Sequence, residues 1–169
     1  AYTTCGFTVF THVYDTWFPE FQDWKQLMEE FFLLPEDTKK KYEYSGVEEN
    51  IGYNWIEKER LTPTMPGDLK ESYNWVSPER ILRMISYEFL YKFEYIFKLK
   101  RGSLVENHID GSSTMRIIHY PAWDGEVKNG QIRGVKHTDY GSITLLWRFD
   151  HTGGLEIENR ETGEWIMHR

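Results

Sequence analysis

The chain has 169 residues, of which 40% are hydrophobic and 17% aromatic, so it carries enough apolar side chains to bury a core and is not disordered throughout. Its 27 acidic residues outnumber its 20 Lys and Arg residues, and the net charge of −7 argues against a surface for nucleic-acid phosphates. No stretch approaches the roughly 20 consecutive apolar residues of a membrane-spanning helix, and the single cysteine, Cys5, excludes an intrachain disulfide.

The first part of the chain predicts a strand, two helices and a long ordered loop. Residues 5–13 are rich in aromatic and β-branched side chains and favour a buried strand. Over residues 17–34 the apolar side chains recur every three or four positions, which indicates an amphipathic helix that Pro35 ends. Residues 36–44 suit a short charged helix, and residues 45–75 lack sustained periodicity and predict a long loop whose aromatic side chains pack.

The second part of the chain predicts one long helix followed by strands. Ser77 suits the helix cap, Pro78 suits the first helical position, and an apolar stripe runs from there to a basic end at residues 98–101. Helices first and strands second indicate an α+β fold or helices packed on a β-sandwich. The predicted strands, separated by Gly, Pro and Asn turn signals, cover residues 115–120, 131–139, 142–149, 155–158 and 164–167.

Two His-x-Asp triplets are the first candidates for chemistry. His108 and Asp110 lie in a cluster of turn residues, so nothing there places their side chains on one face, and we interpret them as part of a polar loop. His137 and Asp139 end a predicted strand, whose alternate side chains point to the same side. The second triplet therefore predicts an imidazole and a carboxylate that converge.

A converging His and Asp can be two members of the 2-His-1-carboxylate set that holds non-haem Fe(II) and leaves coordination positions open. The alternative at this point is a hydrogen-bonded His137–Asp139 pair at a sheet edge, without a metal. The triplet alone does not choose between the two, so the surrounding sequence has to.

The surrounding residues closely resemble the isopenicillin N synthase-like branch of the Fe(II)/2-oxoglutarate-dependent oxygenases. The resemblance is carried by GVKHTDYGSITLL at residues 134–146, TGGLEI at 152–157 and TGEW at 162–165. Supporting matches are CGFTVFTH at residues 5–12 and MRIIHYP at 115–121. The long HTDYG string with its downstream Gly-Gly-Leu and Gly-x-Trp is far more specific than a lone triplet.

The resemblance implies a mainly β fold with flanking helices, a distorted double-stranded β-helix or jelly roll. We expect a single oxygenase domain over residues 1–169, with a helical and loop wall and an early strand in 1–110 and the first part of the jelly-roll core in 111–169. His137 and Asp139 match two of the three iron ligands, and Tyr120 matches a tyrosine that contacts 2-oxoglutarate. No catalytic residue beyond the metal ligands is implied.

The sequence departs from the family pattern at its C-terminal end. The second iron-binding His and the Arg-x-Ser pair that grips 2-oxoglutarate lie farther along the chain in the family. His168 is 29 positions after Asp139 and aligns with a plain strand position, so we expect the third ligand beyond Arg169 and treat His168 as the weaker candidate. About five predicted strands are too few for the roughly eight of a jelly roll, so we expect a core that is incomplete at the C terminus.

The function implied is Fe(II)- and 2-oxoglutarate-dependent oxidation of a small molecule by O2, ending in hydroxylation, desaturation or cyclisation. One alternative is an iron oxidase of the same fold that works without 2-oxoglutarate. Another is a catalytically incompetent fragment or binding module. The family also places Tyr53 near a substrate-covering loop, although ordinary packing explains this tyrosine equally well.

The expected setting is cytoplasmic. The first residues show no basic region leading into an apolar run, as a secretory signal would, and one cysteine fits a reducing compartment. We interpret Cys5 as a small core residue rather than a reactive thiol. We expect a small-molecule substrate and neither nucleic acid nor membrane as a partner, and the sequence carries no signal for an oligomeric state.

Overall fold

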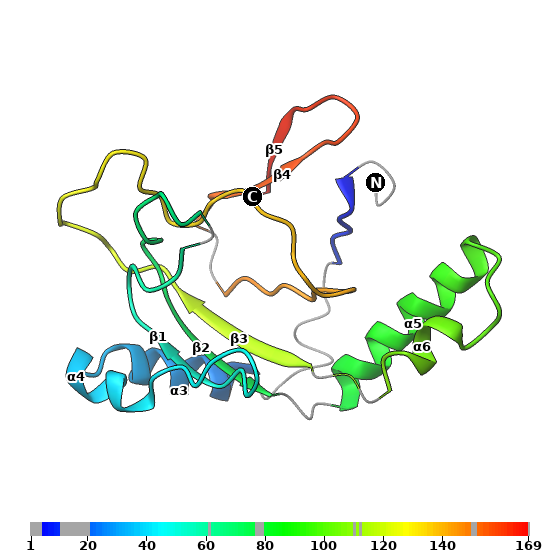
Figure 1. The fold of residues 1–169 in the computed structure, drawn as a ribbon, viewed down its shortest axis with the longest axis horizontal. Helices are drawn as coiled ribbons and strands as arrows, with labels where there is room; N and C mark the ends of the chain where they lie inside the picture. The colour runs from blue at the N-terminus through cyan, green and yellow to red at the C-terminus, as the bar shows by residue number, and fades with distance from the viewer. Residues whose placement is uncertain are drawn as a thin grey trace. The chain divides into compact units, whose positions relative to one another are not determined.

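The computed structural model describes residues 5–10, 21–60, 62–76, 80–109, 111, 113–149 and 152–168. The chain divides into two compact units, Phe31–Leu145 and a second unit made of Ala1–Glu30 with Leu146–Arg169. Each unit is described by itself. The elements are α3 (Phe21–Phe32), α4 (Glu36–Lys39), the 3-10 helix η1 (Lys40–Tyr42), β1 (Gly52–Asn54), β2 (Glu71–Val76), α5 (Arg80–Ile96), α6 (Ser103–Glu106), β3 (Thr114–His119), β4 (Leu155–Glu158) and β5 (Trp165–His168) (Figure 1).

An antiparallel sheet of order β1-β2-β3 organises the larger unit (Figure 1). Tyr53 of β1 lies opposite Tyr73 of β2, and Glu71 at the start of β2 lies opposite His119 at the end of β3. Because side chains alternate along a strand, these four residues share one face of the sheet.

The C-terminal end of α3 covers that face. The ring of Phe31 packs edge-on against the rings of Tyr53 and Tyr73, with centroids 5.6 and 5.2 Å away. The Phe32 ring lies 5.2 Å from the His119 ring. Phe32 and Tyr53 are buried, so the last residues of α3 join the core that forms on this face of the sheet.

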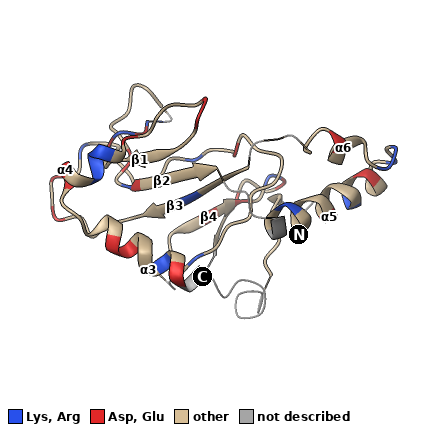
Figure 2. Cartoon of the chain, turned by 90° about the horizontal axis from the view of Figure 1, so that it is seen from below, with Lys and Arg blue, Asp and Glu red and all other residues tan. Residues whose placement is uncertain are grey.

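The short helical segment α4–η1 follows Pro35 and has the charge order that a helix dipole favours. Its first turn carries Glu36 and Asp37, and Lys39, Lys40 and Lys41 follow before Tyr42 ends the segment, so the two signs are separated along it (Figure 2). This segment matters for the core because Lys39 points inward and is buried.

Helix α5 and the single turn α6 are joined through a buried carboxylate. Glu94 accepts hydrogen bonds from the backbone N–H groups of Gly102 and Leu104, both at 2.7 Å, and of Val105 at 3.2 Å. These donors lie at the N-terminal end of α6, where a helix leaves N–H groups without intrahelical partners. Burial would raise the pKa of Glu94, but these hydrogen bonds outweigh it and hold the pKa below its usual range.

The second unit contains an antiparallel hairpin of β4 and β5. Leu155 pairs with His168 and Glu158 with Trp165, and the intervening turn includes Gly163 at a φ of 72°. Glycine adopts this left-handed conformation without a Cβ penalty, so the Thr-Gly turn signal at this position is confirmed. Ile157 is the buried residue of the hairpin.

Two of the predicted strands, 131–139 and 142–149, are wrong as strands. Among the described residues, neither range pairs with another strand, and both form turns and extended loop. Alternating apolar and polar residues predict an extended backbone, whereas a strand also needs a neighbour that satisfies its N–H and C=O groups. The alternating pattern therefore indicates an extended backbone, but it does not show whether a neighbouring strand is present.

The early buried strand is also wrong over the residues that the structure describes. No strand runs through residues 5–10, and the side chains of Phe7, Val9 and Phe10 are 46%, 58% and 60% exposed. Cys5 itself is half-buried. Residues 11–13 of that prediction lie outside the described residues.

The predicted loop at 45–75 contains two strands that the sequence did not reveal. β1 is three residues long, and β2 includes Glu71, Ser72 and Asn74, which are poor strand formers. The predicted helices agree better, since α3, α4 with η1, and α5 lie inside their predicted ranges. Residues 17–20 of the first helix and the capping residues Ser77 and Pro78 of the last lie outside the described residues.

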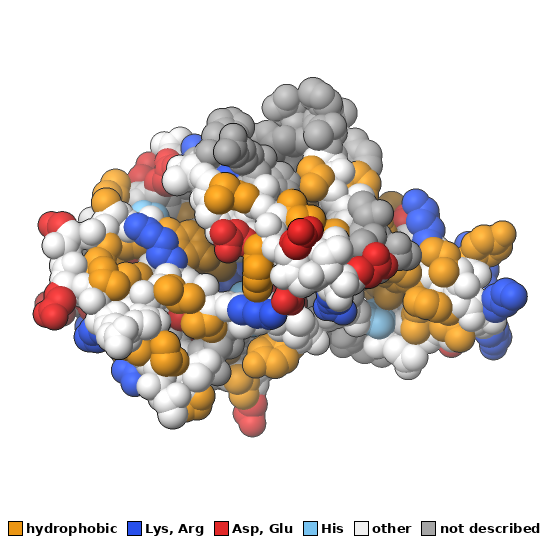
Figure 3. All heavy atoms as spheres, turned by 90° about the horizontal axis from the view of Figure 1, so that it is seen from above, with side chains coloured by type: hydrophobic (Ala, Val, Ile, Leu, Met, Phe, Trp, Pro, Cys, Tyr) orange, Lys and Arg blue, Asp and Glu red, His pale blue; other side chains and the backbone are white. Residues whose placement is uncertain are grey.

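The described part of the chain therefore combines antiparallel strands with flanking helices, as the coarse fold prediction states. Among the described helices, none is both long and apolar enough to cross a membrane. Hydrophobic side chains nevertheless reach the surface in several places, for example Tyr140, Val47 and Leu33. Figure 3 shows hydrophobic and basic side chains next to one another at the right of the view, where α5 ends.

Candidate metal centre

The structure brings the side chains of His137 and Asp139 together. Their closest atoms, Nε2 of His137 and Oδ1 of Asp139, are 3.4 Å apart, and the two side chains are 49% and 50% exposed. The segment forms a loop and not the expected strand, so the convergence comes from local backbone geometry and not from strand alternation. Solvent can reach both donor groups.

The protonation of the imidazole suits a metal ligand. Nδ1 of His137 lies 2.8 Å from the backbone carbonyl oxygen of Val135, and a carbonyl can only accept, so Nδ1 carries the proton. Nε2 is the nitrogen that faces Asp139. In the neutral ring Nε2 carries a lone pair that a metal can accept, whereas in the doubly protonated ring Nε2 donates to the Asp139 carboxylate. A backbone carbonyl on the other ring nitrogen is the usual way in which proteins fix the tautomer of a metal-binding histidine.

The donor set also fits a divalent metal of the Fe(II) type. One imidazole nitrogen and one carboxylate oxygen are ligands that Fe(II) accepts, and two neighbouring ligands of one ion lie about 3 Å apart. The 3.4 Å separation equally fits a direct His–Asp interaction, the alternative that the sequence left open. Within the described ranges, no group of three or more His, Cys, Asp or Glu side chains is placed to hold a metal.

Tyr120 follows β3 directly and is 48% exposed. Its neighbour His119 is the last residue of the strand and points to the face that α3 covers. Exposed and less exposed side chains alternate through β3 from Thr114 to His119, and Tyr120 continues that order with an exposed side chain. The structure thus presents the tyrosine on the side of the strand away from α3.

A buried charged cluster behind Tyr120 was missed by the sequence analysis. The carboxylate of Glu71, 3% exposed, accepts hydrogen bonds from Nζ of Lys39 at 2.7 Å and Nδ1 of His119 at 2.8 Å, and from the hydroxyl of Tyr53. Nζ of Lys39 also donates to the backbone oxygen of Phe32 at 3.0 Å. One carboxylate therefore links α3, α4 and all three strands of the sheet.

The electrostatics of this cluster keep Glu71 ionised. Burial by itself would raise the pKa of the carboxyl, but the hydrogen bonds from Lys39, Tyr53 and His119 outweigh it and lower the pKa below its usual value. The pKa of Tyr53 is raised, first by burial and then by its bond to Glu71, so the phenol stays a proton donor. Tyr53 is therefore a packed core residue, as the packing alternative for this tyrosine states.

The other histidines contribute no second ligand in the described part of the larger unit. The two ring nitrogens of His108 lie 2.6 Å from the Leu104 oxygen and 2.8 Å from the Ser142 hydroxyl, so the polar-loop prediction for His108 is confirmed. Asp110, His12 and His151 lie outside the described residues. His168 ends β5 in the other unit, opposite Leu155.

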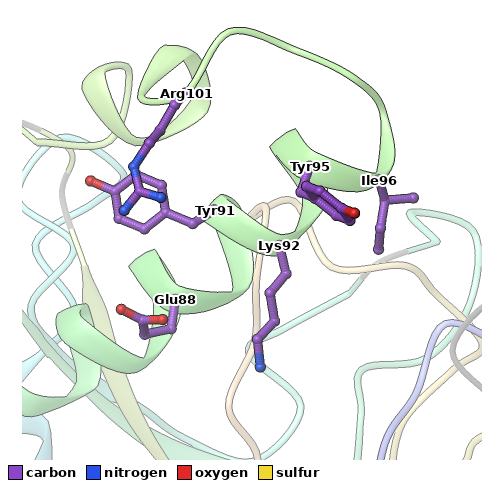
Figure 4. Close-up of a pocket in the computed structure, with 6 residues that line it drawn as sticks. All are labelled: Glu88, Tyr91, Lys92, Tyr95, Ile96 and Arg101. Carbon is purple, nitrogen blue, oxygen red and sulfur yellow. The ribbon is translucent and has the colours of Figure 1, made fainter.

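A shallow recess lies away from these groups, on α5 and the loop behind it. In Figure 4 the guanidinium of Arg101 lies across the ring of Tyr91, and its carbon is 4.6 Å from the ring centroid. Tyr95 and Ile96 are 86% and 63% exposed at the same place. The full lining is Glu88, Tyr91, Lys92, Tyr95, Ile96 and Arg101.

Comparison with known proteins points to one group of enzymes. No family model matches the chain. The chain is 44% identical over 59 residues to the 2-oxoglutarate-dependent dioxygenase citB of Monascus ruber, an alignment that covers 34% of this chain and 18% of the relative. It is 26% identical over 170 residues to the 2-oxoglutarate-Fe(II) type oxidoreductase ppzD of Metarhizium rileyi, covering 78% of this chain and 48% of the relative.

Solved structures give the same result. The crystal structure of a full-length Neurospora crassa protein in complex with alpha-KG matches with a TM-score of 0.68 and 26% identity, covering 88% of this chain and 56% of that chain. These relatives are named as a 2-oxoglutarate-dependent dioxygenase and a 2-oxoglutarate-Fe(II) type oxidoreductase, and a further structural neighbour, from Caulobacter crescentus, is described as a putative 2OG-Fe(II) oxygenase family protein, with a TM-score of 0.66 and 25% identity over 90% of this chain and 58% of that chain. The chain spans about half the length of those that it matches over most of its own length.

Proposed function

We propose that this chain belongs to a non-haem Fe(II)- and 2-oxoglutarate-dependent oxygenase of the isopenicillin N synthase-like branch that oxidises a small molecule. The observation that carries the proposal is the His137–Asp139 pair, in which Nδ1 is bonded to the Val135 carbonyl and Nε2 faces the Asp139 carboxylate. The names of the relatives support it, since one specifies 2-oxoglutarate and the other specifies both 2-oxoglutarate and Fe(II).

In this proposal each residue has a separate task. Nε2 of His137 and a carboxylate oxygen of Asp139 would hold the iron, and the hydroxyl of Tyr120, a residue that is 48% exposed, would bind 2-oxoglutarate. The iron, with 2-oxoglutarate and O2, supplies the oxidising chemistry. The protein residues position these groups and need not act as a general base or nucleophile. Two ligands leave coordination positions for a third protein donor and for the cosubstrate.

The fold assigned in this proposal is a jelly roll with a helical wall. We assign residues 1–110 to the wall and residues 111–169 to the first part of the jelly-roll core, within a single oxygenase domain. The TM-score of 0.68 to the Neurospora crassa structure supports the assignment, although that match covers 56% of the neighbour.

The proposed substrate is a small organic molecule, and the proposed outcome is hydroxylation, desaturation or cyclisation. A further structure of the same Neurospora crassa protein is a complex with alpha-KG and thymine, which supports a small-molecule substrate. With one cysteine in the chain, a reducing compartment such as the cytoplasm is the proposed location.

The test is an anaerobic titration of the chain with Fe(II) followed by 2-oxoglutarate. The proposal expects a weak visible charge-transfer band that appears only when both are present and is lost in Asp139→Ala. If the chain binds Fe(II) without the band, and a separate aerobic assay shows O2 consumption that does not depend on 2-oxoglutarate, the iron oxidase is favoured. A chain that binds Fe(II) no better than a His137→Ala/Asp139→Ala variant would be a non-catalytic domain.

A further inference from the structure

Three consecutive residues, Gln131 to Arg133, fasten the segment that leads to His137. Nε2 of Gln131 donates to the Gly67 oxygen at 3.0 Å, and the Ile132 oxygen accepts from the Leu69 N–H at 3.0 Å. Nη1 of Arg133 donates to the Pro121 oxygen at 2.9 Å. We call residues 131–133 the clamp, because they bond to two other parts of the chain, residues 67–69 and Pro121.

The Gln131 side of the clamp is rigid. Gln131 is 6% exposed, its amide nitrogen also bonds the Glu57 carboxylate, and its amide oxygen accepts from the Lys128 N–H at 3.0 Å. Glu57 and Gly67 are themselves in close backbone contact, since a Cβ on Gly67 would collide with the backbone of Glu57. A buried amide with all of these bonds fixes where the clamp begins.

The Arg133 side joins the residues after β3 to the segment that leads to the candidate ligands. Pro121 follows Tyr120, so the Arg133–Pro121 bond holds the tyrosine end of β3 against the segment that carries His137 and Asp139, four and six residues beyond Arg133. We infer that Arg133 is a positioning residue that sets Tyr120 relative to the His137–Asp139 pair. This inference rests on the proposed function, because it concerns how metal and cosubstrate share that site.

The geometry separates two effects of losing Arg133. Metal binding by His137 and Asp139 depends on local backbone geometry, which the Val135 carbonyl fixes within the same segment. Binding of 2-oxoglutarate needs both the metal and Tyr120, which lie on two different segments. Arg133→Ala should therefore weaken 2-oxoglutarate binding about tenfold, the effect expected for one charge-assisted hydrogen bond, and change Fe(II) affinity by less than about twofold.

The experiment measures Fe(II) affinity and then 2-oxoglutarate affinity at saturating Fe(II), both by anaerobic calorimetry on the full chain. Arg133→Lys should recover part of the 2-oxoglutarate affinity, because an ammonium can still donate to the Pro121 oxygen. The matched control is Arg160→Ala, which removes an exposed arginine of the β4–β5 turn and should leave both affinities unchanged.

A double-mutant cycle with Tyr120→Phe tests the route of the effect. If Arg133 acts through Tyr120, the losses caused by Arg133→Ala and Tyr120→Phe are not additive, because the second change removes a contact that the first has already displaced. Additive losses, or equal weakening of Fe(II) and 2-oxoglutarate binding with a lower unfolding midpoint, would show a merely structural role and overturn the inference.

Hydrogen exchange of the metal-free chain gives a readout that does not depend on the proposed chemistry. Arg133→Ala should speed amide exchange at residues 118–120 and at 134–139 together, while the exchange of α5 stays constant. Unchanged exchange at both segments overturns the inference whatever the chain binds. A wild-type chain that binds neither Fe(II) nor 2-oxoglutarate contradicts both the proposed function and the inference. A wild-type chain that binds both, together with an Arg133→Ala variant that binds 2-oxoglutarate equally well, contradicts the inference alone.

Discussion

At the scale of single residues, Glu71 is a buried carboxylate that accepts hydrogen bonds from three side chains. A carboxylate that is 3% exposed is costly to bury, and it is tolerated because an ammonium, a phenol and an imidazole all donate to it. Each partner comes from a different element, so the cluster holds its members in place only when α4, β1, β2 and β3 have assembled. Glu71 thus makes the position of His119, and of Tyr120 beside it, depend on the whole sheet.

Removing one member of the Lys39–Glu71 pair should be more harmful than removing both. Lys39→Met or Glu71→Gln leaves a buried polar group without its partner, and each should lower the free energy of unfolding by about 3 kcal/mol. The double variant should lose less than the two single losses combined, by on the order of 1 kcal/mol or more. Urea unfolding of the four proteins measures this, and strict additivity would show that the pair is not coupled.

The same carboxylate predicts an acid-sensitive stability. The folded-state pKa of Glu71 lies below its ordinary value of 4.5, so its contribution is fully present above that value and is lost as the pH falls toward the folded pKa. We expect the unfolding free energy to fall as the pH drops below about 4.5, and to fall less steeply in Glu71→Gln. Urea midpoints above and below this pH check it, and parallel curves for the two proteins would contradict it.

At the scale of elements, the long segment between η1 and β2 is held by close backbone contacts. The Glu57 N–H donates to the Asp68 oxygen and the Asp68 N–H to the Glu59 oxygen, both at 3.0 Å, and Gly67 lies within this crossing. A glycine is required there for space, because the nearest backbone atoms leave no room for a Cβ.

Gly67→Ala should therefore destabilise the protein, by about 2 kcal/mol or more, because backbone and not a flexible side chain has to move. The matched control is Gly134→Ala in the segment that leads to His137, where a Cβ would have nothing within 4 Å, and where we expect a change within about 0.5 kcal/mol. Thermal unfolding compares the two. Equal midpoints would mean that the Glu57–Gly67 approach is not tight in solution.

The elements differ in how far the sequence could predict them. α3 and α5 follow from apolar spacing over several turns, and the β4–β5 hairpin follows from its Thr-Gly turn. β1 and β2 could not be predicted in this way, because their register against β3 buries polar residues such as Glu71 through partners 18 to 48 positions away. The loop at 131–139 shows the converse, an alternating pattern without a neighbouring strand.

The candidate site likewise contains residues that the sequence predicts and contacts that it does not. His137 and Asp139 were predicted because two positions in one segment carry the chemistry, and the structure does bring their side chains together. The Glu71 cluster and the Arg133–Pro121 bond could not be predicted, because each joins residues that only the folded chain brings together. Local motifs are visible in a sequence, whereas the contacts that support them depend on tertiary structure.

At the scale of the whole molecule, the chain consists of two compact units and spans about half the length of the enzymes that it matches over most of its own length. The larger unit holds Tyr120, the clamp, His137 and Asp139. The proposed chemistry therefore needs only this unit to supply two metal ligands and one contact for the cosubstrate. The proposed function requires that His137 and Asp139 bind a metal.

The most direct test is an anaerobic Fe(II) binding isotherm for the wild-type chain, His137→Ala and Asp139→Ala, with His108→Ala as the matched control from the other His-x-Asp triplet. We predict that His137→Ala and Asp139→Ala each weaken Fe(II) binding at least about tenfold, since each removes one ligand, and that His108→Ala binds as the wild type does. Equal Fe(II) affinity in all four proteins would contradict the account and leave His137 and Asp139 as a simple interacting pair.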